Sequence, residues 1–325
     1  MVKELASLIQ LINQLIFKVI KEKDIIIFGK NSIIAKNFTR NFHKTRNKII
    51  SITRSPSLEK DIICSLDQEI SSDNLDNICS KIVDNSNYID KVFILFAWIG
   101  RPRANSSYDE TWEKNKKIIL NFIYICKKLN PSKIIFLSST SLYPENSKNY
   151  FCELDQTNPK TPYSKQKLIA EKQIENFAHD QNIQLSILRI SSAYGFDNRF
   201  SEQGVINKWL YDAIKYGKIN LLNSKESIIN FISFDQISNA IISSITESLE
   251  GTYNIASQES ISLKNIILEI ERITKKKLIL HIINDKKRSI NINTNKFYKA
   301  TGIKFENAVV SNIESIYSTI LKELN

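Results

Sequence analysis

The sequence predicts an α/β fold, in which a doubly wound parallel sheet is joined to a smaller C-terminal lobe. Up to about residue 190, short apolar runs alternate with stretches of helical periodicity. The apolar runs are continuous, which is typical of strands buried on both faces in a parallel sheet covered by helices. Beyond that point the alternation loosens, and this change predicts the second lobe.

Each element follows from its local pattern. The strands are expected where aliphatic and aromatic residues run together, at 24–28, 48–53, 91–97, 133–138 and 184–189, with a short strand at 252–255 that returns to the structure. Helices are expected where apolar residues recur every three to four positions, at 33–43, 73–84, 109–129, 163–180, 203–216 and 262–275. No internal repeat or low-complexity linker interrupts this order.

The N-terminal segment 1–23 is expected to form an amphipathic helix. Apolar residues in 5–20 follow a helical period, and Gln10, Asn13 and Lys18 interrupt the run. We expect this helix to pack on its own domain or on a partner. A membrane-surface helix is disfavoured because the polar face is poor in Lys and Arg. Neither a signal peptide nor a transmembrane segment is expected, since no small-residue cleavage site follows.

Composition disfavours several classes of protein. The four cysteines form no CxxC pair and the three histidines lie far apart, so we expect no metal site, no disulfide framework and a reducing cytoplasm. The net charge of +11 invites a nucleic-acid interpretation. Because no block of five or more Lys or Arg occurs, we expect no nucleic-acid partner and only a modest benefit for anionic substrates.

The first expected strand ends in F-G-K-N-S-I-I-A, residues 28–35. A dinucleotide-binding turn needs backbone N–H groups and a helix N-terminus that meet a pyrophosphate. Gly29, Ser32 and Ala35 have the spacing of such a turn, although only the first is glycine. The signal is weak by itself, and an ordinary strand–helix turn has the same pattern.

The second strand ends at Thr53-Arg54-Ser55, with no carboxylate. An acid there accepts hydrogen bonds from the ribose of NAD, whereas an arginine accommodates the 2′-phosphate of NADP. We therefore expect NADP(H) to be favoured, with NAD(H) as the alternative. An exposed arginine in a loop explains Arg54 almost equally well.

Ser138 to Ser141 end the strand at 133–138, and Tyr163 and Lys167 follow at i and i+4 of a helix. Ligands bind at the carboxyl ends of strands in open α/β sheets. An ammonium beside a phenol lowers the phenol pKa from its usual value of about 10. Such a tyrosine exchanges a proton with a sugar hydroxyl or carbonyl at neutral pH. A nearby serine holds the same oxygen.

These residues resemble the extended short-chain dehydrogenase/reductase family, the NAD(P)-dependent epimerase/dehydratases of nucleotide sugars. The resemblance covers residues 24–320, and its motifs occur in the order typical of the family. They are N-K-K-I-I-L with Asn115, S-S-T-S-L-Y-P with Ser139 and Tyr143, Y-x-x-x-K at Tyr163 and Lys167, R-I-S-S-A-Y-G (189–195), I-N-F-I-S-F-D (229–235) and G-T-Y-N-I-A-S (251–257).

The resemblance implies a Rossmann-type NAD(P)-binding domain at 24–182. It also implies that 183–325 is mainly a substrate-binding lobe, with segments returning to the sheet. Catalysis is assigned to Ser139, Tyr163 and Lys167, with Asn115 supporting the geometry. The expected cofactor contacts are Gly29, Asn31, Ser32, Ile33, Ile34, Arg54, Leu66, Phe96 and Ala97, together with Tyr163 and Lys167. The expected substrate contacts are Thr140, Ser141, Ser192, Arg199, Asn207 and Asn230.

The implied reaction is hydride transfer at a carbon, by our interpretation C4, of a nucleotide-linked sugar in surface polysaccharide or deoxysugar biosynthesis. Thr140 and Ser141 replace the acidic pair of the dehydratases, and Ser141 replaces the cysteine of 3,5-epimerising reductases, so both activities are disfavoured. A 4-epimerase and a 4-ketoreductase remain, and the missing acid after the second strand leans toward the reductase. A homodimer through helices 109–129 and 163–180 is also implied.

The substrate lobe departs from the family pattern. Asn230 replaces an arginine that clamps the diphosphate, and Ser192 replaces an asparagine. Arg199, Asn207 and Lys208 are candidate substitutes, and neither the sugar nor the base can be named. The competing hypothesis is a non-catalytic NAD(P)-binding regulatory or assembly protein, which the eroded glycine turn suggests. The joint retention of the serine, tyrosine and lysine of the catalytic motifs speaks against it.

Overall fold

The computed structural model describes residues 23–42, 47–55, 58, 60–100, 105–145, 150–195 and 204–324. The helix expected at 1–23 lies outside these residues, except for Lys23. The chain divides into two compact units, and it passes between them several times. The first comprises residues 1–137, 168–187 and 239–251, and the second comprises 138–167, 188–238 and 252–325. The expected boundary at residue 182 stays a prediction.

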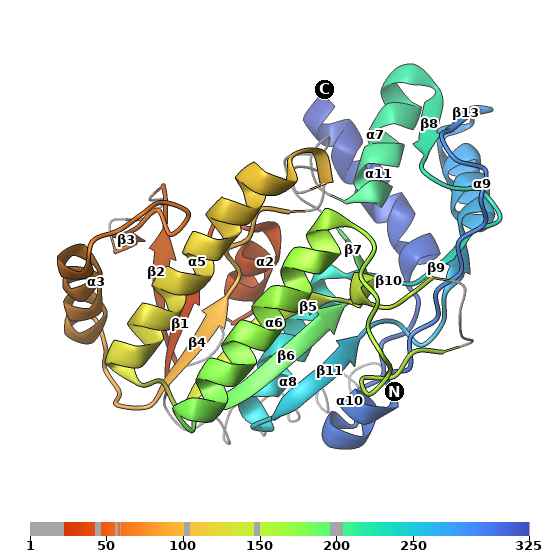
Figure 1. The fold of residues 1–325 in the computed structure, drawn as a ribbon. Coiled ribbons are helices and arrows are strands. Elements are labelled where there is room, and N and C mark those ends of the chain that lie inside the picture. The colour runs from red at the N-terminus through yellow and green to blue at the C-terminus, as the bar shows by residue number, and fades with distance from the viewer. Residues whose placement is uncertain are drawn as a thin grey trace, which may run out of the picture. The chain divides into compact units, whose positions relative to one another are not determined.

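A seven-stranded sheet forms the centre of the fold (Figure 1). Its order is β11 (Gly251–Ile255), β6 (Gln184–Ile190), β5 (Lys133–Ser139), β4 (Lys91–Leu95), β1 (Asp24–Phe28), β2 (Lys48–Thr53) and β3 (Ile62–Ile63). β1 pairs in parallel with β2 and β4, β2 with β3, and β4 with β5. The predicted doubly wound parallel sheet is therefore confirmed.

The strands begin and end close to the positions that the sequence predicts. β1 and β2 match their expected ranges residue for residue, whereas β4 stops two residues early. It stops because the N–H groups of Phe96 and Ala97 both donate to the carbonyl of Phe28, 2.9 and 2.8 Å away, and the chain leaves the ladder. The two-residue strand β3 is too short to produce a periodic signal.

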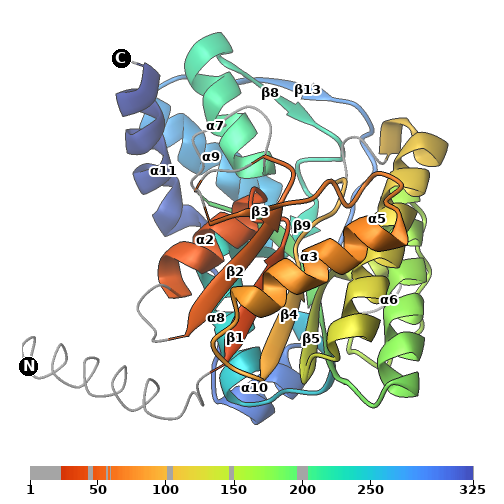
Figure 2. The same ribbon diagram turned by 90° about the vertical axis from the view of Figure 1, so that its left-hand side faces the viewer.

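Helices cover both faces of this sheet. α3 (Ser72–Asp84), α5 (Tyr108–Leu129) and α6 (Pro162–Asp180) lie on one face, and α2 (Ile33–Phe42) and α8 (Phe234–Thr246) lie on the other (Figures 1 and 2). α8 was not predicted, because serine-rich segments favour turns. In the fold, the Ser238 and Ser244 hydroxyls donate to the carbonyls of Phe234 and Ala240 and so stay within the helix.

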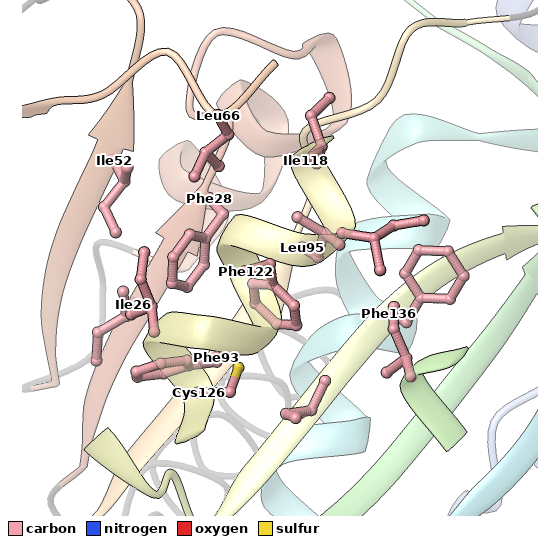
Figure 3. Close-up of a cluster of buried hydrophobic side chains, with 14 of the residues drawn as sticks. Ile26, Phe28, Ile52, Leu66, Phe93, Leu95, Ile118, Phe122, Cys126 and Phe136 are labelled. Atoms are coloured by element: carbon pink, nitrogen blue, oxygen red, sulfur yellow. The ribbon is translucent and has the colours of Figure 1, made fainter. Parts of the chain in front are cut away.

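The core of the first unit lies between the sheet and α5. Phe122 of α5 meets Phe28 of β1 edge to face, with ring centroids 4.8 Å apart, and Phe93 of β4 packs beside both (Figure 3). All three side chains are fully buried. Burial of this kind is the dominant stabilising contribution in folding, and it holds rigid the strands whose ends carry the candidate site.

The second unit is built around three helices, α7 (Val205–Tyr216), α9 (Leu263–Thr274) and α11 (Val309–Leu324). Their apolar faces form one cluster, which includes Trp209, Ile266 and Ile313. Three two-stranded sheets surround it: β7 (Ser192–Tyr194) with β10 (Phe231–Ser233), β9 (Ile228–Ile229) with β12 (Ile261–Ser262), and β8 (Lys218–Leu221) with β13 (Ile279–Ile282). The 3₁₀ turn η1 (Thr140–Leu142) and α10 (Asn295–Thr301) complete this unit.

Candidate active site

The turn after β1 has the conformation that a phosphate-binding turn requires. Gly29 has φ of +93°, and a Cβ there would lie 2.5 Å from the Ala97 nitrogen. Only glycine fits this close approach of two backbones. The Ser32 hydroxyl accepts a hydrogen bond of 3.1 Å from the Ala35 N–H and so caps the start of α2, where Ile33 and Ile34 form the first turn. A helix N-terminus therefore follows directly on β1, as dinucleotide binding needs.

Asn31 and Lys30 fix the rest of this turn. The Asn31 amide donates to the Thr53 hydroxyl at 2.8 Å and to the Ser55 carbonyl at 2.9 Å, which ties the turn to the end of β2. The Lys30 ammonium pairs with Asp61 at 2.7 Å, and both side chains are largely buried. The Lys30–Asp61 pair was missed in the sequence, because the two residues lie 31 positions apart.

Arg54 lies at the end of β2, as expected, and it has an acidic neighbour. Its Nη1 lies 3.2 Å from Oδ2 of Asp67, and its side chain stays 66% exposed. The second oxygen of that carboxylate, Oδ1, is buried and has no hydrogen-bond partner within the described chain. Asp67 was not among the predicted residues. The sequence feature that could have indicated it is an acidic residue directly after the mostly apolar stretch 62–66.

Three predicted cofactor contacts lie close to these turns and pack against the core: Leu66, Phe96 and Ala97. The Leu66 side chain belongs to the core, and its carbonyl accepts a hydrogen bond of 2.8 Å from the Asn121 amide (Figure 3). The Phe96 ring is buried against Phe38, and Ala97 meets Gly29. The direct cofactor contacts expected from these three residues stay predictions.

Asn115 is fully buried on α5 and holds the chain that follows β4. Its Oδ1 accepts a hydrogen bond of 2.8 Å from the N–H of Ile99. The Nδ2 group donates to the carbonyl of the same residue at 3.5 Å. A side-chain amide that pairs with both backbone groups of one residue fixes the path of that loop. The catalytic support expected of Asn115 stays a prediction.

Ser139 is the last residue of β5 and the N-cap of η1. Its hydroxyl donates to the Ser141 hydroxyl at 3.0 Å and accepts a hydrogen bond of 3.1 Å from the N–H of Ser141. These two contacts hold the hydroxyl in one orientation. Thr140 is buried, and the hydroxyl of the preceding Ser138 is buried without a hydrogen-bond partner in the described part of the chain.

Tyr163 and Lys167 lie one turn apart at the start of α6, as predicted. Thr161 and Ser164 form a reciprocal cap: the Thr161 N–H donates to the Ser164 hydroxyl at 3.0 Å, and the Ser164 N–H donates to the Thr161 hydroxyl at 3.2 Å. Pro162 occupies the first helical position, where its missing N–H costs nothing. Lys167 is only 4% exposed, whereas Tyr163 is half-buried.

Three residues from the motifs form a buried network in the second unit. The Tyr143 hydroxyl donates to Asn254 at 2.8 Å and accepts from the Arg189 guanidinium at 3.0 Å. Burial raises the pKa of Tyr143, and the positive charge of Arg189 opposes that shift. A buried phenol held in this way is a structural group. The network joins the motifs at 143, 189 and 254 within the second unit.

The predicted substrate residues differ in what surrounds them. Asn230 is buried: its amide donates to the Ser257 carbonyl at 2.8 Å, and its Oδ1 accepts from the Ser257 N–H at 3.1 Å. Asn207 is buried at the start of α7 and donates to the Gly195 carbonyl at 2.5 Å. The N–H of Ser192 donates to the Asn230 carbonyl at 3.2 Å. Arg199 lies outside the described residues. Substrate contact by any of them stays a prediction.

Two buried polar atoms near these predicted substrate residues have no hydrogen-bond partner in the described chain. Oδ1 of Asn207 is buried and has no hydrogen-bond partner among the residues described. Lys208, beside it, pairs with Asp212 at 3.0 Å. The Ser191 hydroxyl, just after β6, is also buried without a partner in the described chain. Neither Ser138 nor Ser191 was predicted as a separate site residue.

The polar groups of the first unit are of the kinds that bind a dinucleotide. Gly29 gives the tight turn, the start of α2 presents N–H groups, and Asp67 keeps a buried acceptor for a donor group beside Arg54. Within the described part of the chain, no three His, Cys, Asp or Glu side chains come together to hold a metal ion. Likewise, no helix there is both long and apolar enough to cross a membrane.

Curated relatives include both a reductase and an epimerase of nucleotide sugars. The dTDP-4-dehydro-6-deoxyglucose reductase of Escherichia coli is 33% identical over 150 residues, which is 46% of this chain and 48% of the relative. The UDP-glucuronate 4-epimerase of Thermodesulfobacterium geofontis is 23% identical over 198 residues, 59% of this chain and 60% of the relative. The matches thus span about half and three-fifths of those proteins.

Solved structures share the whole fold. The UDP-glucose 4-epimerase of Bifidobacterium longum, in complex with NAD+ and UDP, matches with a TM-score of 0.79 at 17% identity. The match covers 93% of this chain and 99% of that one. The sequence model of the NAD dependent epimerase/dehydratase family matches residues 25–256. With the sheet, the first turn and the Tyr163–Lys167 helix in place, this match shows that the chain belongs to the NAD dependent epimerase/dehydratase family.

Proposed function

We propose that this chain transfers hydride to or from C4 of a nucleotide-linked sugar, as a 4-epimerase or a 4-ketoreductase in deoxysugar or surface polysaccharide biosynthesis. The observation that carries the proposal is the capped start of α6, which presents Tyr163 one turn before the buried Lys167. Ser139 supports it, because the Ser141 N–H holds its oxygen in place and its proton would turn from the Ser141 hydroxyl to a reacting oxygen when substrate binds.

Each residue has a separate role in the proposed mechanism. Tyr163 gives a proton to the C4 oxygen of a 4-keto sugar, or takes one from a C4 hydroxyl. The Lys167 ammonium stabilises the phenolate that remains or forms. Ser139 donates a hydrogen bond to the same oxygen, and Asn115 keeps the chain after β4 in place. The nicotinamide cofactor, when bound, supplies the hydride acceptor or donor at C4.

NADP(H) is the favoured cofactor in this proposal. Arg54 is mostly exposed at the end of β2, and the rest of its guanidinium remains available for a 2′-phosphate beyond the contact with Asp67. NAD(H) is the alternative. The turn at Gly29 would meet the pyrophosphate, which both cofactors share, and so does not discriminate between them. The relative with 33% identity is a reductase, which agrees with the leaning toward net reduction.

The test combines one measurement on the purified protein with one assay. Native mass spectrometry shows whether a nicotinamide cofactor is retained; a retained NAD favours epimerisation and an empty site favours reduction. Purified enzyme is then supplied with UDP-, dTDP- and GDP-linked 4-keto sugars and NADPH, or with the 4-hydroxy sugars alone. Turnover that is lost in Tyr163→Phe supports the proposal. Substantial turnover by that variant, or none with any of these sugars in the wild type, overturns it.

We further propose a homodimer, which α5 and α6 would form. Light scattering after size exclusion measures the mass directly. A monomer at micromolar concentration contradicts the dimer and leaves the proposed chemistry standing.

A further inference from the structure

The ribbon of β8 and β13 exposes several large apolar side chains within the second unit. The two strands run parallel, with Ile279 beside Lys218 and Ile282 beside Leu221 (Figure 1). Successive side chains of a strand point to opposite faces. Ile219, Leu221 and Leu280 point inward and pack in the cluster of α7, α9 and α11.

The outward positions are those that a solvated face fills with polar residues. Here three of them are apolar: Leu222 is 66% exposed, Ile279 62% and Ile283 70%, and Tyr216 lies at the end of α7 with 52% exposed. Lys218, Asn220 and His281 occupy the outward positions between them. The N–H of Ile279 donates to the Gly217 carbonyl, and that of Ile283 to the Leu221 carbonyl, so these side chains belong to one ribbon. Exposed apolar side chains set among polar ones on one surface are typical of an interaction surface.

Basic residues concentrate on the two segments that form this ribbon. Residues 215–225 and 275–288 contain nine Lys or Arg and one Asp, whereas the whole chain of 325 carries a net charge of +11. Two of the nine pair with acids outside these segments, Lys277 with Glu271 and Arg288 with Glu145. Lys215 and Lys218 lie over the Tyr216 ring at 5.6 and 5.5 Å. Lys275, Lys276, Lys286 and Lys287 are exposed before and after β13.

This combination points to one class of partner. A second copy docked through the same face would bring two clusters of like charge together, which costs several kcal/mol in a specific interface. Nucleic acid is recognised by aromatic stacking and phosphate contacts, and exposed isoleucine and leucine add little to either. An anionic bilayer accepts both features, because lysines attract its headgroups while aliphatic side chains and tyrosine enter the interface.

We propose that the face formed by Tyr216, Leu222, Ile279 and Ile283 and the lysines around it docks this protein on anionic lipid membranes. The aliphatic side chains enter the headgroup region, and the long lysine side chains reach the phosphates around them. This inference does not depend on the proposed catalytic function, because none of these residues belongs to the candidate active site.

Vesicle co-sedimentation with the full chain tests the proposal. The probes are vesicles of phosphatidylcholine alone and of phosphatidylcholine mixed with phosphatidylglycerol. We expect binding only to the anionic vesicles, and weaker binding as salt is raised. Ile279→Ser with Ile283→Ser, and separately Lys218→Glu with Lys286→Glu, should each lower the partition coefficient by about tenfold or more.

Matched variants elsewhere separate this surface from general charge and apolarity. Ile89→Ser removes an isoleucine that is 98% exposed, and Lys60→Glu with Lys127→Glu makes the same charge change on the first unit. Both should bind nearly as the wild type does. Equal loss in these controls, retained binding by the ribbon variants, or no binding to any vesicle overturns the proposal. Binding only to RNA or to an acidic protein overturns it as well.

Discussion

The Tyr143 hydroxyl donates a hydrogen bond to Oδ1 of Asn254, 2.8 Å away, and so joins two segments separated by 111 residues. The Arg189 guanidinium donates to the same hydroxyl at 3.0 Å. Asn254 in turn donates to the carbonyls of Phe151 and Asn293, each at 3.1 Å. One phenol therefore anchors several loops of the second unit.

Tyr143→Phe should destabilise the protein by about 1–3 kcal/mol, because it leaves the buried Asn254 oxygen without its donor and removes one acceptor of the Arg189 guanidinium. Urea denaturation measures this loss. Turnover per folded molecule should stay near the wild-type value, in contrast to Tyr163→Phe. A variant that is stable but inactive would assign Tyr143 to the reaction instead.

Tyr163→Phe should lower the turnover number by about 10²–10⁴-fold, the usual contribution of a positioned acid or base. Cofactor affinity should change little, because the variant keeps the capped helix and Lys167. Steady-state kinetics and fluorescence titration with NADPH measure the two quantities separately. Parallel loss of both would point to a disturbed fold and would withdraw the acid–base role.

Gly29→Ala should cost about 2–4 kcal/mol of stability and should weaken cofactor binding. The alanine would adopt a left-handed φ and place its Cβ 2.5 Å from the Ala97 nitrogen. Gly100→Ala is the control, since a Cβ there meets nothing within 4 Å. Thermal melts with and without NADP+ compare the two variants, and equal melting temperatures would contradict the close approach.

Arg54→Ala should weaken NADPH binding by about 10–150-fold and leave NADH binding nearly unchanged, because a guanidinium–phosphate contact contributes about 1.5–3 kcal/mol. Arg272→Ala removes an arginine that pairs with Glu269 on α9, and it is the matched control. Tighter binding of NADH than of NADPH by the wild-type protein would reject the preference.

Lys133 predicts a pH-dependent stability. Its side chain is 1% exposed, and its ammonium donates to the Leu249 carbonyl and to Gln184. Burial, helped by the charge of Lys23 and opposed by that of Glu250, lowers the pKa of Lys133 to about 7. Between pH 7 and about 10 the unfolded chain thus binds more protons at this residue than the folded chain does.

Stability should consequently rise with pH across that window, by up to about 1.4 kcal/mol per pH unit from this group. Lys133→Met should remove the slope and should be relatively more stable at pH 7 than at pH 9, when each is compared with the wild type. Urea denaturation of both proteins at the two pH values measures the difference. Parallel pH dependences would show that Lys133 keeps its proton in the folded state.

The sequence by itself determined most strands of the sheet and the helical start that carries Tyr163 and Lys167. β1 and β2 were predicted residue for residue, because strands buried on both faces must be apolar throughout. The placing of Tyr163 and Lys167 one turn apart followed from helical spacing. These features depend on neighbours only a few positions away in the chain.

Tertiary structure decided what depends on distant partners. α8 is helical although its serines favour turns, since packing on the sheet outweighs local propensity. The Arg54–Asp67 and Lys30–Asp61 pairs, the buried ammonium of Lys133 and the Tyr143–Asn254 contact each join residues far apart in sequence. Local periodicity cannot predict such pairs, because residues distant in sequence become buried and hydrogen-bonded to one another only when the strands assemble into the sheet.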